Sequence, residues 1–170
     1  MSIISKIIFQ LLILFLFSFK FVLAENLKEI GKFKDWKAIK ISDENSKVCF
    51  AQSKPVLQSP KKNDREARLF VTFRPDEKVS DEVSITSGYE YNTQNSIIAS
   101  SGKSKYKFDI SQDFFAWMTS GKKENIMVKV MKKGSRIMVT GYNEKGSQTI
   151  DHYSLLGFTK AYNTAKKACS

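Results

Sequence analysis

The sequence holds one histidine, and its neighbours decide whether it could act as a general base. His152 stands between Asp151 and Tyr153, in a stretch whose residue types are typical of a β-strand. Consecutive strand residues point to opposite faces of a sheet, so the Asp151 carboxylate is badly placed to orient the imidazole of His152. We therefore assign His152 to packing or to the surface and expect no catalytic residue here.

Other chemistry-bearing patterns are equally incomplete. Asp76 with Glu77 and Asp81 with Glu82 could suggest glycoside hydrolysis, which uses two carboxyl groups about 5–10 Å apart. Both pairs follow Pro75, so charged turn residues in solvent are the simpler interpretation. The sequence around Gly102 lacks the spacing of a phosphate-binding loop and the helix that should follow it. One histidine and two cysteines also exclude the usual structural zinc sites. The sequence thus predicts no enzyme, no metal site and no cofactor.

Aromatic residues are the remaining candidates for binding chemistry. Phe114, Phe115 and Trp117 form a dense cluster, while Tyr89 and Tyr91 lie in or near an expected loop. Exposed aromatic side chains are common in sugar and protein recognition sites. Packing in the core is the default interpretation for this cluster, because a domain of this size needs large apolar residues inside. We take Tyr89, Tyr91 and Trp117 as the candidate binding residues.

The two cysteines predict a structural disulfide. Cys49 and Cys169 are the only thiols, and neither belongs to a CxxC sequence, which argues against a redox-active pair. A bridge would close a loop of 120 residues and stabilise the fold by about 4–5 kcal/mol in the chain-entropy description. The two Cα atoms should then lie about 4.4–6.8 Å apart.

The first 24 residues predict export. Lys6 precedes an almost entirely apolar run at residues 7–19, and Val22 and Ala24 occupy the −3 and −1 positions of a signal-peptidase site. The run is shorter than the roughly 20 residues of a spanning helix. We expect cleavage between Ala24 and Glu25 and export to the periplasm or the outer cell surface. An oxidising compartment also suits the disulfide.

The charge balance says less about a partner than its size suggests. The chain carries 28 basic and 17 acidic residues, a net charge of +11 that becomes +9 when Lys6 and Lys20 leave with the first 24 residues. Only four of the basic residues are arginines, the side chain that planar recognition of phosphate favours. A solvated basic surface is the first interpretation, and weak attraction to a polyanion or a membrane surface is the second. We expect no nucleic acid partner for an exported protein.

Short strand-like segments separated by turn signals fill most of the chain, and they predict a single domain over residues 25–170. The expected strands are residues 34–41, 47–56, 68–74, 82–89, 96–99, 106–110, 136–142 and 148–155. Turn signals at intervals of about 8–12 residues favour an all-β, jelly-roll-like β-sandwich of antiparallel strands. Phe158, Ala161, Tyr162 and Ala165 follow helical spacing and predict a C-terminal helix. Ile126, Val130 and Met131 lie near helical spacing and would form the apolar side of a short internal helix over residues 124–133, and a strand is the alternative there.

Several short segments, in a fixed order along the chain, carry a family resemblance. They are residues 48–51 (Val-Cys-Phe-Ala) with 53–55 (Ser-Lys-Pro), 82–85 leading into Gly88-Tyr89, 131–134 (Met-Lys-Lys-Gly), 139–141 (Val-Thr-Gly) and the run 146–161. Together they resemble the invasion-associated locus B family of alphaproteobacteria over nearly the whole expected mature chain.

The resemblance implies an exported β-sandwich protein of the bacterial envelope with no established catalytic activity or cofactor. In pathogenic members the family is linked to entry into host cells. We expect a non-enzymatic envelope protein that binds another macromolecule, either an envelope protein or a glycan. A carbohydrate- or lipid-binding periplasmic module is the alternative function, and a hydrolase comes third.

Overall fold

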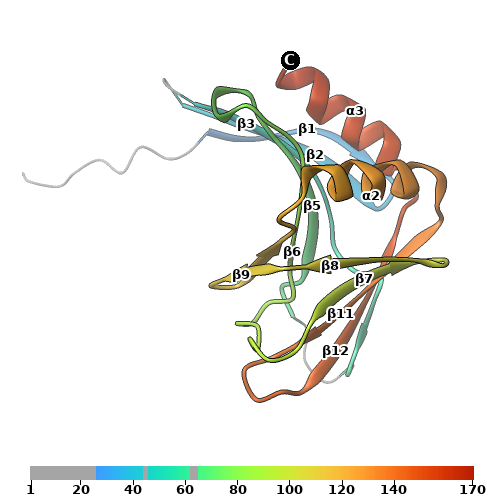
Figure 1. Ribbon diagram of the computed structural model, residues 1–170. Helices are drawn as coiled ribbons and strands as arrows, with labels where there is room; N and C mark the ends of the chain where they lie inside the picture. Colours follow the sequence, from blue (N-terminus) through green and yellow to red (C-terminus); the bar gives the residue numbers. More distant parts are fainter. Residues whose placement is uncertain (1–25, 44–45, 62–64) are drawn as a thin grey trace, which may run out of the picture.

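The computed structural model describes residues 26–43, 46–61 and 65–170 and contains two antiparallel β-sheets and two α-helices (Figure 1). Sheet A has seven strands in the order β1-β2-β3-β5-β6-β10-β9, and sheet B has five in the order β4-β12-β11-β7-β8. The bounds in sheet A are β1 Asn26–Phe33, β2 Trp36–Ser42, β3 Lys47–Ser53, β5 Arg68–Arg74, β6 Val79–Thr86, β9 Ile110–Gln112 and β10 Phe115–Trp117. Those in sheet B are β4 Leu57–Ser59, β7 Ile97–Ser101, β8 Ser104–Phe108, β11 Arg136–Tyr142 and β12 Gln148–Ser154.

The side chains of sheet A alternate between an inner face and an outer face. In β3, Cys49, Ala51 and Ser53 are buried, and the residues between them point the other way. The inner face meets the inner face of sheet B and both helices in one hydrophobic core (Figure 1). The core includes Leu69, Val71, Val83 and Ile85 of sheet A with Ile137, Val139 and Tyr153 of sheet B.

The C-terminal helix α3 (Phe158–Ala168) covers the inner face of sheet A over β1, β2 and β3. Its buried residues are the four that the sequence spacing predicted. Gly157 precedes the helix with φ of +91°, and a Cβ there would lie 1.8 Å from the carbonyl oxygen of Phe33, so only glycine fits. A disulfide joins Cys49 to Cys169 with the Cα atoms 5.8 Å apart, which confirms that prediction.

The segment before β11 is a helix, α2 (Gly121–Lys133), rather than a strand. Its buried side is Glu124, Met127, Val128 and Met131, while Ile126 is exposed. The expectation that Ile126 belongs to the apolar side was therefore wrong. The carboxylate of the buried Glu124 has a hydrogen-bond partner, because its Oε1 accepts a bond of 2.9 Å from the backbone N–H of Val83 in β6. Burial raises the pKa of Glu124, and the nearby charges of Glu82 and Asp81 act in the same direction.

The predicted two-sheet, mostly antiparallel fold with a C-terminal helix is confirmed, but four strands were not anticipated. These are β1, β4, β9 and β10, and β6 also ends at Thr86 rather than at residue 89. The pattern of β1 is broken by a bulge between Glu29 and Gly31, and the other three strands are only three residues long. The predicted signal peptide lies outside the described residues. Within the described part of the chain, neither helix has the length and apolar character needed to cross a membrane.

Candidate functional site

Two of the three predicted binding residues, Tyr89 and Tyr91, lie in the segment that follows β6, and they differ in burial. Tyr91 is only 6% exposed, and its hydroxyl donates a 2.9 Å hydrogen bond to Oγ of Ser87. Tyr89 is half-buried, with its hydroxyl 2.6 Å from Oγ1 of Thr149. Burial raises the pKa of both tyrosines. Tyr91 therefore has no surface to offer a ligand, although a binding role for Tyr89 and Trp117 stays a prediction.

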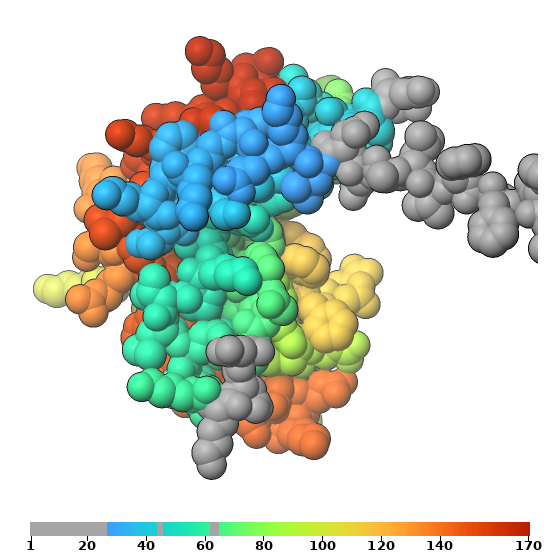
Figure 2. All heavy atoms as spheres, turned by 180° about the vertical axis from the view of Figure 1, so that it is seen from behind, coloured from blue at the N-terminus to red at the C-terminus, as the bar shows by residue number. Residues whose placement is uncertain are grey.

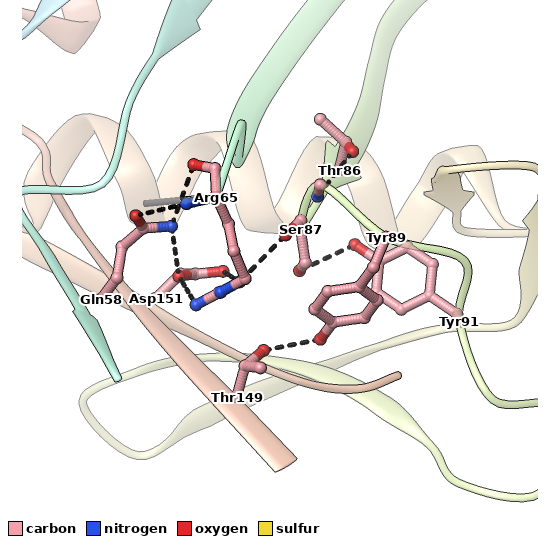
Figure 3. Close-up of polar contacts among 9 residues, drawn as sticks. Gln58, Arg65, Thr86, Ser87, Tyr89, Tyr91, Thr149 and Asp151 are labelled. Carbon is pink, nitrogen blue, oxygen red and sulfur yellow. Dashed lines mark hydrogen bonds and ion pairs between the residues drawn. The ribbon is translucent and has the colours of Figure 1, made fainter. Parts of the chain in front are cut away.

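A buried ion pair lies beside these tyrosines and joins three separate segments (Figure 3). Asp151 of β12 is fully buried, and its two carboxylate oxygens accept bonds of 2.6 and 3.0 Å from Nη2 and Nη1 of Arg65. Nη1 of Arg65 also donates to the backbone oxygen of Ser87 at 3.0 Å, and Nε2 of Gln58 donates to Asp151 at 3.2 Å. We call Arg65, Asp151, Gln58 and Ser87 the clasp, because they connect β4 and β12 of sheet B to the end of β6 in sheet A.

The clasp has the geometry of a structural element rather than of a reactive one. The Asp151 carboxylate accepts hydrogen bonds from three nitrogen donors, which fix its position between the two sheets. His152, next to it in β12, is half-buried and lies on the opposite face of the strand, as its position in the sequence predicted. The sequence did not predict the clasp, because Arg65 was assigned with the other basic residues to a solvated surface.

The acidic residues of the two pairs that follow Pro75 contact other groups of the protein rather than solvent alone. Glu77 and Glu82 both pair with Arg74, the latter through two bonds of 2.8 and 3.0 Å. The carboxylate of Asp81 accepts a hydrogen bond from the hydroxyl of Tyr162 in α3. Among the described residues, no group of three or more His, Cys, Asp and Glu side chains is placed to hold a metal ion.

The outer face of sheet A carries aromatic side chains, of which the sequence pattern singled out Phe115 and Trp117 but not Phe50 or Phe70. Phe50, Phe70, Phe115 and Trp117 come from β3, β5 and β10 and form a chain of ring contacts that we call the aromatic row. The ring centroids lie 5.8 Å apart from Phe50 to Phe70, 6.0 Å from Phe70 to Phe115 and 5.9 Å from Phe115 to Trp117. The strand register explains the alignment, because Phe70 pairs with Ser84, which in turn pairs with Trp117.

The aromatic row borders a hollow on the molecular surface. The hollow has a volume of about 410 Å³, and the rings of Phe70, Phe114 and Phe115 line it together with the side chain of Arg68. Phe114 is 48% exposed and Phe115 is 38% exposed, so the expectation that this aromatic cluster belongs to the core was wrong for both. Figure 2 shows the yellow segment of β9 and β10 beside the green strands β5 and β6, the parts of the chain from which most of the lining residues come.

The arrangement suits recognition of a partner surface or chain. Adjoining exposed aromatic rings mark interaction sites more often than isolated ones do, because soluble proteins rarely expose large apolar patches. A usable signal did exist in the sequence. Residues 69–71 (Leu-Phe-Val) are apolar on both faces of an expected strand, and so are residues 48–51. An apolar outer face follows from this pattern once the sheet is known to be covered on one side only.

Comparison with known proteins places the chain. The sequence family described as "Invasion associated locus B (IalB) protein" matches residues 36–166. The crystal structure of invasion associated protein B from Bartonella henselae is similar in fold, with a TM-score of 0.58 and 14% sequence identity over 81% of this chain and 96% of that one. No curated protein sequence matches the chain.

Proposed function

The chain belongs to the invasion associated locus B family, and from this premise we propose an exported, non-enzymatic envelope protein that binds another macromolecule through the outer face of sheet A. The observation that carries the proposal is the aromatic row, with Phe114 and Phe115 exposed beside a hollow of about 410 Å³. Fully burying one such ring against a partner is worth about 1.5–3 kcal/mol. Two or three rings are therefore enough to anchor a specific contact.

Export is supported by the sequence of residues 1–24 and by the disulfide. Cys49 and Cys169 form a bridge that persists best in an oxidising compartment. The proposed location is the periplasm or the outer cell surface. The intact mass of the exported protein should correspond to a chain that begins at Glu25, and a mature form that retains Met1 would contradict export by cleavage.

The absence of catalysis is part of the proposal and is supported by the site geometry. The two sequence features closest to a catalytic pair are Asp151 and His152, and they face opposite sides of β12. The carboxylate is held by Arg65 instead. The outer face of sheet A carries phenylalanine and tryptophan rings, which bind without supplying a nucleophile or a base.

A carbohydrate-binding role is the second candidate, and one observation favours it. Phe115 contacts the ring of Trp117 at 5.9 Å between centroids and leaves 38% of its surface exposed, so the outer face offers an aromatic ring to a ligand. Sugar rings commonly stack on such aromatic surfaces. A lipid-binding role has no comparable feature on this face.

Site-directed photo-crosslinking in the source bacterium tests the proposal. A photoreactive benzoylphenylalanine is placed at Phe114 of the outer face or at Ile126 of α2, two side chains with matched exposures of 48% and 46%. We expect discrete adducts of defined mass from position 114 and none from position 126. Equal adducts from both positions, or none from position 114, would contradict the assignment of the outer face as the binding surface.

A further inference from the structure

A second hollow adjoins the aromatic row, and it is basic. Its volume is about 440 Å³, and its lining includes Lys32, Lys34, Lys37, Lys54 and Arg68, with Asp35 as its acidic member. Gln52 and Arg68 line both this hollow and the apolar hollow at the aromatic row, so the two hollows adjoin each other. We call the first the basic hollow and the second the apolar hollow.

Neighbouring acids compensate part of this charge but not all of it. Glu29 pairs with Lys37 at 2.6 Å, while Glu66 pairs with Arg68 at 2.6 Å and lies 3.7 Å from Lys54. Glu29, Glu66 and Asp35 are three carboxylates beside the five cations of the basic hollow, so an excess of two positive charges remains. Within the described part of the chain, no carboxylate lies within 4.0 Å of the amines of Lys32 or Lys34, and both residues are exposed.

The basic hollow is built on a fixed backbone rather than on a loose loop. Lys34 and Asp35 form the turn between β1 and β2, where Lys34 has φ of +55°. The turn is tied to the rest of the molecule because the N–H of Asp35 donates to the oxygen of Leu156 at 3.3 Å. The hydroxyl of Ser53 also donates to the oxygen of Asp35 at 2.7 Å. A backbone that is already held in place lowers the ordering cost of binding.

The strand register gives the distance between the two hollows. Lys37 pairs with Gln52, Gln52 pairs with Phe70, and the same row of the sheet continues through Ser84 to Trp117. Neighbouring strands are about 4.8 Å apart, so Lys37 and Phe70 are separated by roughly 10 Å, and Lys37 and Trp117 by roughly 19 Å. An extended peptide rises about 3.3 Å per residue, so five or six residues span the whole row.

We infer that the outer face binds an acidic segment of a partner protein, with its carboxylates in the basic hollow and an aromatic or large aliphatic side chain in the apolar hollow. This inference rests on the proposed function and names its partner. Arginine beside aromatic rings is the composition of protein-binding hot spots, and excess positive charge favours an acidic partner. A flat anionic membrane fits less well, because Glu29 and Glu66 lie at the same face and would be pressed against headgroups of like charge.

A peptide titration tests the inference. The probe is the acetylated and amidated pentapeptide Asp-Glu-Phe-Glu-Asp, added to the isotope-labelled mature protein and followed by amide chemical shifts. We expect saturable shifts at Lys34, Gln52, Arg68 and Phe115. Replacing the acids of the probe by lysine should abolish binding, and replacing its phenylalanine by alanine should weaken binding about tenfold, as loss of one buried ring predicts.

Two charge-reversal variants separate local recognition from overall charge. Lys32→Glu with Lys34→Glu changes the basic hollow, and Lys122→Glu with Lys123→Glu makes the same change in net charge at exposed positions of α2. We expect at least tenfold weaker binding for the first variant and no change for the second. Equal losses, no saturable binding of the acidic probe, or binding of phosphatidylglycerol vesicles in its place would overturn the inference.

The crosslinking experiment distinguishes this inference from the proposed function. If adducts from position 114 persist in the variant with Lys32→Glu and Lys34→Glu, the outer face still binds a partner but not through acidic groups in the basic hollow. If position 114 gives no adducts in the protein without these two substitutions, the proposed function fails and the inference fails with it.

Discussion

The clasp and the aromatic row lie on the inner and outer sides of sheet A, and each has an arginine and aromatic rings close by. Arg65 of the clasp lies beside Tyr89, and Arg68 lines the apolar hollow that the aromatic row borders. In the clasp, the guanidinium of Arg65 lies 5.7 Å from the ring centre of Tyr89 and pairs with a carboxylate that is fully buried. In the aromatic row, the rings contact one another along the sheet, while Phe115 and the neighbouring Phe114 remain partly open to solvent. The same residue types thus hold the sheets together in one place and leave a surface uncovered in the other.

Burial and the contacts that a side chain makes within the protein, rather than its residue type, separate structural from functional groups here. Asp151 and Tyr91 are the kinds of residue that suggest chemistry, yet both are fully occupied inside the protein. Phe70 and Phe115 are the kinds of residue that suggest a core, yet both face outward.

Removing the disulfide should have the largest effect, because it releases the helix that covers the inner side. Cys49→Ala with Cys169→Ala frees a loop of 120 residues, and we expect a loss of about 4–5 kcal/mol in the free energy of unfolding. Chemical denaturation of the oxidised protein and of the variant gives the difference. A loss below about 1 kcal/mol would mean that α3 is held by packing alone.

Breaking the clasp should come next. Asp151→Ala leaves the Arg65 guanidinium buried without its counter-ion, and we expect a loss of about 3–5 kcal/mol in unfolding free energy. His152→Ala is the matched control one residue away on the other face of β12, and we expect a change below about 1 kcal/mol for it. Similar losses for the two variants would refute the structural role of the clasp.

Alkaline pH should lower the free energy of unfolding through the tyrosines of the inner side. The phenylalanine and tryptophan side chains of the aromatic row do not titrate and contribute nothing to this loss. Burial raises the pKa of Tyr89, Tyr91 and Tyr153, so the folded protein keeps protons that the unfolded chain loses above about pH 10. Stability is therefore full below pH 10 and falls as pH rises further, by about 1.4 kcal/mol per pH unit for each tyrosine.

Denaturation at pH 9 to 11 measures this slope, and Tyr91→Phe isolates one contribution. The variant should lose less stability per pH unit than the parent protein, by up to about 1.4 kcal/mol. Identical slopes for the two proteins would show that Tyr91 does not lose its proton on unfolding in this range.

The parts of the fold that the sequence predicted depend on local patterns. Phe158 and Ala165 follow helical spacing within one segment, and Cys49 had no thiol partner other than Cys169. The clasp and the aromatic row depend on register between distant strands instead. Arg65 and Asp151 are 86 residues apart in the chain, and no local pattern pairs them. The aromatic row needs β3, β5, β6 and β10 to be in order, and β10 was itself not anticipated.

If the outer face binds the partner and the clasp only holds the fold, one substitution in each should affect different properties of the protein. Phe115→Ser removes a ring that is already 38% exposed, so we expect it to change stability by no more than about 1 kcal/mol. Asp151→Asn keeps the shape of the side chain but removes the charge that pairs with Arg65, so it should lower the thermal midpoint clearly.

The measurement is the yield of partner adducts from the photo-crosslinker at position 114, normalised to folded protein, for these two variants. We predict at least a tenfold loss for Phe115→Ser and an unchanged yield for Asp151→Asn. An unchanged yield for Phe115→Ser, together with a loss for Asp151→Asn, would contradict the account and would move the binding site to the inner side of sheet A.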